Sequence, residues 1–374
     1  MLSRRLESLS PYVPAEQPTD RAYVKLNANE NPYSPASGVA QAVVEALTND
    51  SAKLGLYPDP DALSLREAIA AMLNATGGVL ANSEAARARL SKPVTRQMIF
   101  CGNGSDEVLS FIFCAFFDSN QPLVLPQFTY SFYPVYCGFY GVKPHRVPLT
   151  ADWRVDSRAM VEAACDSHSP LILANPNAPT GDALATAEIE AMLAHFPRDR
   201  AFVVDEAYAD FGQESCLPLL ERFENLVVVR TFSKSLSFAG MRLGYAVANE
   251  AAISALFTVK NSFNHFPVDF LAQVAGRAAC EHYEYYAANA RTIAHTRDEF
   301  AEGLRLKGWC VIPAKANFVF AQKPGVAGDV VYQRAKAAGY LIRHFGERGI
   351  EDFVRITVGT EEQMSGLLAV LSDI

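Results

Sequence analysis

The chain has 374 residues, of which 50% are hydrophobic, and it carries a formal net charge of −8 at pH 7. This length and apolar content are sufficient for two domains with a sizeable core, and the negative charge argues against nucleic acid or an anionic membrane as the natural partner. The seven cysteines are scattered without the paired spacing of metal ligands, so we expect free thiols and no metal site.

The order of the expected elements predicts an α/β protein with two domains. Residues 1–30 contain several prolines and predict an irregular arm that packs with the smaller domain. Strands and helices then alternate through residues 31–265, which is typical of a mostly parallel sheet between layers of helices. From about residue 267 to 307 an unbroken helical pattern predicts a long helix, which leads into a smaller α/β domain over residues 266–374.

The sequence shows no sign of secretion or of a membrane span. The start of the chain, MLSRRLESLSPYVP, has no apolar core long enough for a signal peptide, and no later apolar run is long enough to cross a bilayer. We therefore expect a cytoplasmic protein.

A glycine-rich turn is the first motif that indicates chemistry. The segment IFCGNGSDEVLSFIFCAFF, residues 99–117, predicts a strand, a turn that includes Gly104, and a helix that begins near Ser105. Unpaired backbone N–H groups at the start of a helix bind anions, so the turn predicts a phosphate site. Tyr130, in the following segment FTYSFY, offers an aromatic face for stacking on a flat ring, although a core aromatic residue would give the same pattern.

Two later apolar runs end abruptly in polar residues. LILANPNAPTG ends a strand in a proline and asparagine turn, and AFVVDEAYADF ends one at Asp205. Active-site groups of open parallel sheets lie at the carboxyl ends of strands, so Asp205 is where a catalytic carboxylate is expected. Such a carboxylate can pair with a protonated pyridine nitrogen, and Tyr208 could donate to a phenolic oxygen of the same ring. A strand end that meets solvent is the plain alternative.

The segment TFSK, residues 231–234, followed by Arg242, indicates the kind of cofactor. A lysine amine such as that of Lys234 can form a Schiff base with an aldehyde. The hydroxyls of Thr231 and Ser233 and the guanidinium of Arg242 could hold a phosphate through charge-assisted hydrogen bonds. A lysine in a polar turn is the alternative for an isolated motif, but the order of these segments favours one site for a phosphorylated aldehyde.

Taken together, these motifs resemble those of the aspartate-aminotransferase-like, fold type I family of pyridoxal-phosphate enzymes. The resemblance extends over nearly the whole chain, through SPYVP, LNANENPYSP, YPDPDALSLREAIA, GNGSDEVL, NPNAPTG, DEAYADF, TFSKSLSFAGMRLGY and VRITVGT. Within the family, LNANENP, YPDPD and VRITVGT are most similar to the histidinol-phosphate aminotransferases. The resemblance implies a large domain with a mostly parallel sheet between helices, and a smaller α/β domain.

The resemblance also implies pyridoxal 5′-phosphate as the cofactor and a role for each matching residue. Lys234 would be the Schiff-base lysine, Asp205 the partner of the pyridine nitrogen and Tyr208 the donor to the phenolic oxygen. The remaining matches would surround the cofactor phosphate or lie over the ring: Gly104, Ser105, Asp106, Tyr130, Ser233 and Arg242.

One position departs from the family pattern. Ala178 stands where the family usually has an asparagine whose amide reaches the phenolic oxygen. Asn175 or Asn177 would then take over, or Tyr208 would act alone. We favour Asn175, because it directly follows the apolar strand.

The substrates implied by the resemblance are L-histidinol phosphate as amino donor and 2-oxoglutarate as acceptor, within histidine biosynthesis. Both are anionic, and Arg343 in LIRHF and Arg355 in VRITVGT lie near the ends of neighbouring candidate strands, where they would bind the anionic end. Tyr12 and Asn29 would close this pocket from the arm. A surface charge at Arg343 and simple packing of Tyr12 are the alternatives.

A shared active site is the last implication. In the family, the tyrosine that corresponds to Tyr57, on the loop GLYPDPDALSLREAI, crosses a two-fold interface to the neighbour's cofactor phosphate and pocket. A homodimer is therefore expected, with two composite sites.

Rival functions share the cofactor motifs. An aromatic or broad-specificity aminotransferase would differ only in pocket residues, and a decarboxylase or carbon–sulfur lyase would keep the fold and cofactor but change the reaction. A non-catalytic, cofactor-binding regulatory module is disfavoured by the acidic net charge.

Overall fold

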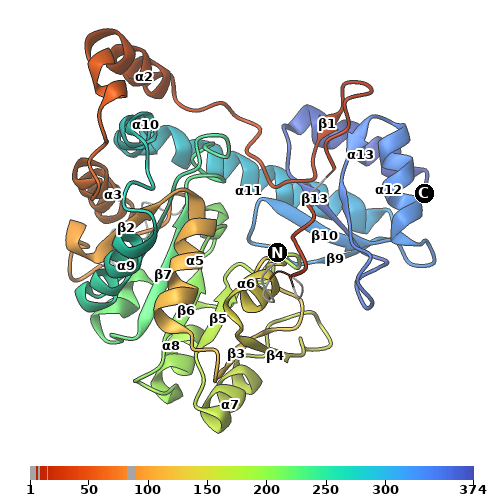
Figure 1. The fold of residues 1–374 in the computed structure, drawn as a ribbon. Helices are drawn as coiled ribbons and strands as arrows, with labels where there is room; N and C mark the ends of the chain where they lie inside the picture. The colour runs from red at the N-terminus through yellow and green to blue at the C-terminus, as the bar shows by residue number, and fades with distance from the viewer. Residues whose placement is uncertain (1–5, 7–8, 15, 82–89) are drawn as a thin grey trace.

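A computed structural model describes residues 6, 9–14, 16–81 and 90–374, and its larger part is built around a seven-stranded sheet (Figure 1). The strand order is β2-β8-β7-β6-β5-β3-β4. All neighbouring pairs from β7 to β4 are parallel, whereas β8 is antiparallel to both of its neighbours. The strands are β2 (Ile99–Gly102), β3 (Pro122–Pro126), β4 (Lys143–Val147), β5 (Leu171–Ala174), β6 (Phe202–Asp205), β7 (Leu226–Thr231) and β8 (Gly244–Ala248).

Helices cover both faces of this sheet, because its central strands are apolar on both sides. In β6, Phe202 and Val204 belong to the core cluster on one face and Val203 to the cluster on the other. The first face packs against α3 (Leu63–Thr76), α7 (Ser157–Ser167), α8 (Thr186–His195) and α10 (Phe270–Glu281). The second packs against α5 (Gly104–Phe116), α6 (Tyr133–Tyr140) and α9 (Glu250–Phe263). Helix α2 (Ser37–Asn49) packs on α10.

The C-terminal part forms a smaller α/β unit. Its antiparallel sheet has the order β12-β13-β10-β9. The N-terminal segment joins it, because β1 pairs in parallel with β11, and Figure 1 shows the red start of the chain beside the blue end. The elements are β1 (Val24–Lys25), β9 (Cys310–Ile312), β10 (Phe318–Gln322), α12 (Gly328–Ala337), β11 (Tyr340–Leu341), β12 (Arg343–His344), β13 (Val354–Thr357) and α13 (Glu361–Ser372).

The helical stretch between the two parts differs from the single helix that the sequence pattern predicts. It is broken at His282 into α10 and α11 (Tyr283–Leu306). His282 leaves helical geometry with a φ of −104° and a ψ of 27°, and its ring Nδ1 lies 2.8 Å from the carbonyl oxygen of Ala278, at the end of α10. The backbone N–H of His282 also donates to this carbonyl, so the ring adds a second contact at the helix end, which a periodicity of apolar residues does not reveal.

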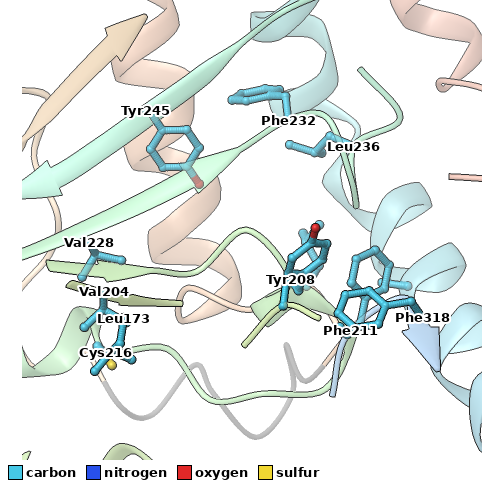
Figure 2. Close-up of a cluster of buried hydrophobic side chains, with 14 of the residues drawn as sticks. Leu173, Val204, Tyr208, Phe211, Cys216, Val228, Phe232, Leu236, Tyr245 and Phe318 are labelled. Atoms are coloured by element: carbon cyan, nitrogen blue, oxygen red, sulfur yellow. The ribbon is translucent and has the colours of Figure 1, made fainter. Parts of the chain in front are cut away.

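The core also supports the loops at the carboxyl ends of the central strands. Figure 2 shows Leu173, Val204 and Val228, from three neighbouring strands, in one buried cluster that extends to the rings of Tyr208 and Phe318. Those two rings pack edge to face, with centroids 5.1 Å apart. Across the described ranges, no helix is long and apolar enough to cross a membrane.

Candidate active site

Asp205 is the last residue of β6, and its carboxylate is buried. It is 4% exposed and accepts hydrogen bonds from the hydroxyl of Tyr133 at 2.8 Å and the backbone N–H of Ala207 at 3.2 Å. Burial raises the pKa of Asp205 to about 6, and these two hydrogen bonds oppose that effect. Asp205 is therefore a fixed acidic group at the position where the sequence predicts it.

Lys234 follows β7 on a tight loop and is held by the N-terminal segment. Its Nζ donates to the carbonyl oxygen of Ala28 at 3.1 Å, and the side-chain amide of Asn31 donates to the carbonyl oxygen of Lys234 at 2.9 Å. Burial lowers the pKa of Lys234 to about 8, and the nearby cation of Arg355 acts in the same direction. The neutral amine, which a nucleophile or base requires, is therefore a minority form near physiological pH, but a far larger one than for an ordinary lysine.

The N-terminus of α5 lies against β8 and Arg242. A Cβ on Gly244 would approach the backbone nitrogen of Ser105 to 2.3 Å, and a Cβ on Gly104, whose φ is +83°, would meet the Arg242 guanidinium at 2.6 Å. Glycine is required for these close approaches. The guanidinium also pairs with Asp106 at 3.2 Å, and the hydroxyl of Tyr130 donates to the same carboxylate at 2.9 Å.

These groups line a cavity of about 160 Å³, which we call the inner cavity. Asp205 and Lys234 both line it, and hydroxyl and guanidinium groups line it as well. Of the residues that the sequence analysis assigned to a cofactor, the inner cavity contains Ser105, Asp106, Tyr130, Asp205, Tyr208, Thr231, Ser233, Lys234 and Arg242.

A second cavity of about 240 Å³, the outer cavity, shares Tyr130, Tyr208 and Lys234 with the first. Its lining comes from the arm, the large part and the small part together. Of the residues assigned to substrate binding, it contains Tyr12, Asn29, Arg343 and Arg355.

The two arginines of the outer cavity face each other across adjacent strands. Arg343 on β12 lies directly opposite Arg355 on β13. Like charges in such a pair repel, so an anion placed between them is favoured. Burial and the charge of Arg343 lower the pKa of Arg355, and the Arg355 Nε is buried without a hydrogen-bond partner. The Arg355 side chain lines the outer cavity, where its guanidinium can meet an anionic ligand.

The side chain of Asn175 is directed to a neighbouring backbone segment and not to the cavity where we expected it. Its side chain donates to the carbonyl oxygen of Leu184 at 3.0 Å and accepts from the backbone N–H of the same residue at 2.8 Å. The amide of Asn177 similarly donates to the carbonyl oxygen of Phe128 at 2.9 Å. Both side chains hold backbone turns, whereas Ala178 lines both cavities. Asn175 is therefore not placed to replace the missing amide at the phenolic oxygen, and we correct that preference.

Tyr57 lies away from both cavities of its own chain. Its side chain is 82% exposed and its ring stacks on Phe266, with centroids 4.5 Å apart. It borders a surface groove of about 790 Å³ between α2, α3 and α10.

Two residues near the site were missed by the sequence analysis. Tyr133, the donor to Asp205, belongs to the segment FTYSFY in which only Tyr130 was assigned. Asn31, which holds the Lys234 loop, lies within LNANENP. Their contacts join distant parts of the chain, so local patterns carry no signal for them. No group of three or more candidate metal ligands occurs in the described part of the chain.

The model of aminotransferase class I and II matches residues 21–371, so the chain belongs to that family. A protein named histidinol-phosphate aminotransferase from Syntrophus aciditrophicus is 48% identical over 372 residues, with 99% of this chain and 97% of that protein covered. A protein of the same name from Acinetobacter baumannii (strain ATCC 17978) is 42% identical over 369 residues, with 99% of this chain and 96% of that protein covered.

Solved structures agree on the fold. The histidinol-phosphate aminotransferase of Sinorhizobium meliloti, in complex with pyridoxal-5′-phosphate, gives a TM-score of 0.84 at 24% identity and covers 100% of this chain and 96% of its own. The aspartate aminotransferase of Thermus thermophilus with maleate gives a TM-score of 0.80 at 21% identity, with 100% of this chain and 99% of that chain covered. The predicted aspartate-aminotransferase-like α/β fold is thereby confirmed.

Proposed function

We propose that the protein catalyses pyridoxal-phosphate-dependent transamination of L-histidinol phosphate with 2-oxoglutarate, giving imidazole-acetol phosphate and glutamate in histidine biosynthesis. The observation that carries the proposal is the convergence of Lys234, Asp205 and the facing Arg343–Arg355 pair on two joined cavities. The names of the full-length relatives support the choice of donor. A role for this protein in histidine biosynthesis would support a cytoplasmic location.

The inner cavity fits a phosphorylated pyridine aldehyde. Arg242, Ser233, Thr231 and the N-terminus of α5 at Gly104 and Ser105 are the groups that would hold its phosphate. Asp205 would pair with the ring nitrogen, Tyr208 would donate to the phenolic oxygen, Tyr130 would lie over the ring, and Lys234 would carry the cofactor covalently. When bound, pyridoxal phosphate supplies an electron sink for the bonds at the substrate's α-carbon.

The chain's own groups then move the protons. Lys234 would take the proton from the substrate's α-carbon as a neutral amine, which its lowered pKa of about 8 favours. Buried Asp205, held in place by Tyr133 and Ala207, would supply a negative charge to the ring nitrogen. Arg355 and Arg343 hold the anionic end of donor and acceptor in turn, so one pocket serves both half-reactions.

We further propose a homodimer in which Tyr57 completes the partner's site. Three large apolar side chains close to Tyr57 in the sequence, Leu54, Leu56 and Leu63, are exposed, and so is Phe263 at the end of α9. Exposed apolar side chains of this kind favour association with a second copy. We divide the chain into an arm of residues 1–30 that packs with the small domain, a large domain of 31–265 and a small domain of 266–374. The pairing of β1 with β11 supports the place of the arm.

Half-reaction spectroscopy tests the proposal. Purified protein loaded with pyridoxal phosphate is mixed with histidinol phosphate, phenylalanine, tyrosine or aspartate, and the loss of the bound cofactor's absorbance is followed. We expect the highest kcat/KM for histidinol phosphate. Failure of every amine to bleach the cofactor would exclude transamination.

An aromatic aminotransferase is the second candidate, because the outer cavity is lined by the rings of Tyr12, Phe128, Tyr130 and Phe345. A faster half-reaction with phenylalanine or tyrosine than with histidinol phosphate would favour it.

A further inference from the structure

Asn29 is a buried residue of the arm that contacts the catalytic tyrosine. It is 1% exposed, and its side-chain amide Nδ2 donates to the hydroxyl oxygen of Tyr208 at 2.9 Å. Its φ of 54° is in the left-handed region, which asparagine tolerates better than most residues. The chain therefore adopts an unfavourable backbone conformation at the point where this contact is made.

The small domain holds Asn29 in one orientation. The Asn29 backbone N–H donates to the hydroxyl of Thr357 at 2.9 Å, and that hydroxyl donates to the Asn29 Oδ1 at 3.2 Å. The amide of Asn317 donates to the Asn29 carbonyl oxygen at 3.1 Å. Because the oxygen of the Asn29 side chain is occupied by Thr357, its N–H side must face Tyr208.

The hydrogen bond from Asn29 leaves the Tyr208 hydroxyl free to act as a donor. A phenol oxygen that accepts from an amide keeps its own proton for another acceptor. Tyr208 is 7% exposed and lines both cavities, so the open direction for that proton is the ligand space. Burial raises the pKa of Tyr208, whereas Arg355 and the hydrogen bond from Asn29 lower it, and a more acidic phenol is a stronger donor.

The turn on the other side of the cavity supplies no amide for this purpose. Ala178 has none, and the amides of Asn175 and Asn177 donate to the backbone carbonyls of Leu184 and Phe128 and belong to residues that line neither cavity. Asn29 instead brings a side-chain amide to the Tyr208 hydroxyl.

We propose that Asn29 is a positioning residue that directs the Tyr208 hydroxyl as a donor toward the phenolic oxygen of bound pyridoxal phosphate. This role rests on the proposed function, because it needs the cofactor in the inner cavity. Asn29 acts through Tyr208 and is not itself the donor to the cofactor.

The test is the pH titration of the bound cofactor's absorbance, which does not depend on turnover. A hydrogen bond donated to the phenolic oxygen favours the form from which the proton has left, so weakening it raises the midpoint. Asn29→Gly removes the amide and keeps the left-handed backbone accessible. We expect its midpoint to rise by about one pH unit, a tenfold change in the protonation equilibrium.

A double variant separates positioning from a merely structural role. If Asn29 acts through Tyr208, then Tyr208→Phe raises the midpoint at least as far, and adding Asn29→Gly to it produces no further rise. Equal shifts by Asn29→Gly with and without the Tyr208 hydroxyl, or no shift in either, would overturn the inference.

Thr357 provides a second, independent variant should Asn29→Gly fold poorly. Thr357→Val removes the hydroxyl that orients Asn29, and we expect a smaller rise of the midpoint. Thr357→Ser keeps the hydroxyl and is expected to titrate like the wild type. Equal midpoints for Thr357→Val and Thr357→Ser would overturn the proposal.

The outcomes also separate this inference from the proposed function. A wild-type protein that binds no pyridoxal phosphate would overturn both. If the wild type binds the cofactor and Asn29→Gly leaves the midpoint unchanged, only the inference is overturned.

Discussion

The proposed role of Lys234 as the Schiff-base lysine predicts that cofactor uptake depends on its protonation state. Because burial lowers the pKa of Lys234 to about 8, we expect the rate at which cofactor-free protein combines with pyridoxal phosphate to rise with pH and to level off above about pH 8. Stopped-flow absorbance measures this rate. A rate that keeps rising toward about pH 10, where an ordinary lysine titrates, would contradict the assignment.

Removal of the Lys234 amine separates binding from chemistry. Lys234→Ala retains Arg242, Ser233 and the α5 terminus at Ser105, so we expect it to bind pyridoxal phosphate and to lose nearly all turnover. Equilibrium dialysis and a coupled assay for glutamate measure the two effects. Normal transamination by this variant would contradict the proposed mechanism.

Arg355 is predicted to serve both substrates. Its contact with an anion is worth about 1.5–3 kcal/mol, so Arg355→Ala should weaken each half-reaction by about one to two orders of magnitude in kcat/KM. Arg343→Ala, on the facing strand, should act in the same direction. If only the 2-oxoglutarate half-reaction suffers, the phosphate of the donor binds elsewhere and the substrate assignment loses its main support.

At the scale of the elements, the contact between α5 and β8 shapes the proposed phosphate site. A Cβ on Gly244 would come within 2.3 Å of the Ser105 backbone nitrogen, so Gly244→Ala must push the helix terminus away from its place. We expect the dissociation constant for pyridoxal phosphate to rise at least about tenfold, the equivalent of one lost hydrogen bond. Gly240→Ala is the matched control, because a Cβ there meets no atom within 4 Å. Equal affinities of the two variants would show that the helix terminus does not hold the phosphate.

At the scale of the whole molecule, the exposed Tyr57 predicts a site built from two chains. Lys234→Ala and Tyr57→Phe proteins are mixed under conditions that exchange subunits. If Tyr57 acts in the partner's site, each mixed dimer has one intact site and one doubly defective site, so activity should exceed the sum of the parents. No gain, with mixed dimers verified by mass spectrometry, would place Tyr57 outside the partner's site.

The sequence by itself determined the fold class and the cofactor chemistry. The apolar run that stops at Asp205 and the segment that carries Lys234 are local patterns, and in a parallel sheet such strand ends meet at one edge. Both residues accordingly line the inner cavity. The break at His282 escaped prediction, because a side chain that bonds a helix-terminal carbonyl leaves the apolar periodicity unchanged.

Only the tertiary structure decided which groups hold the proposed catalytic residues. Asn29 and Tyr208 are separated by 179 positions along the chain, and Tyr133 and Asp205 by 72. The partner of each amide, the Leu184 carbonyl for Asn175 and the Tyr208 hydroxyl for Asn29, was likewise decided by the tertiary structure. Hydrogen bonds between distant residues depend on how the arm and the small domain pack against the sheet, and no local pattern of residue types encodes that packing.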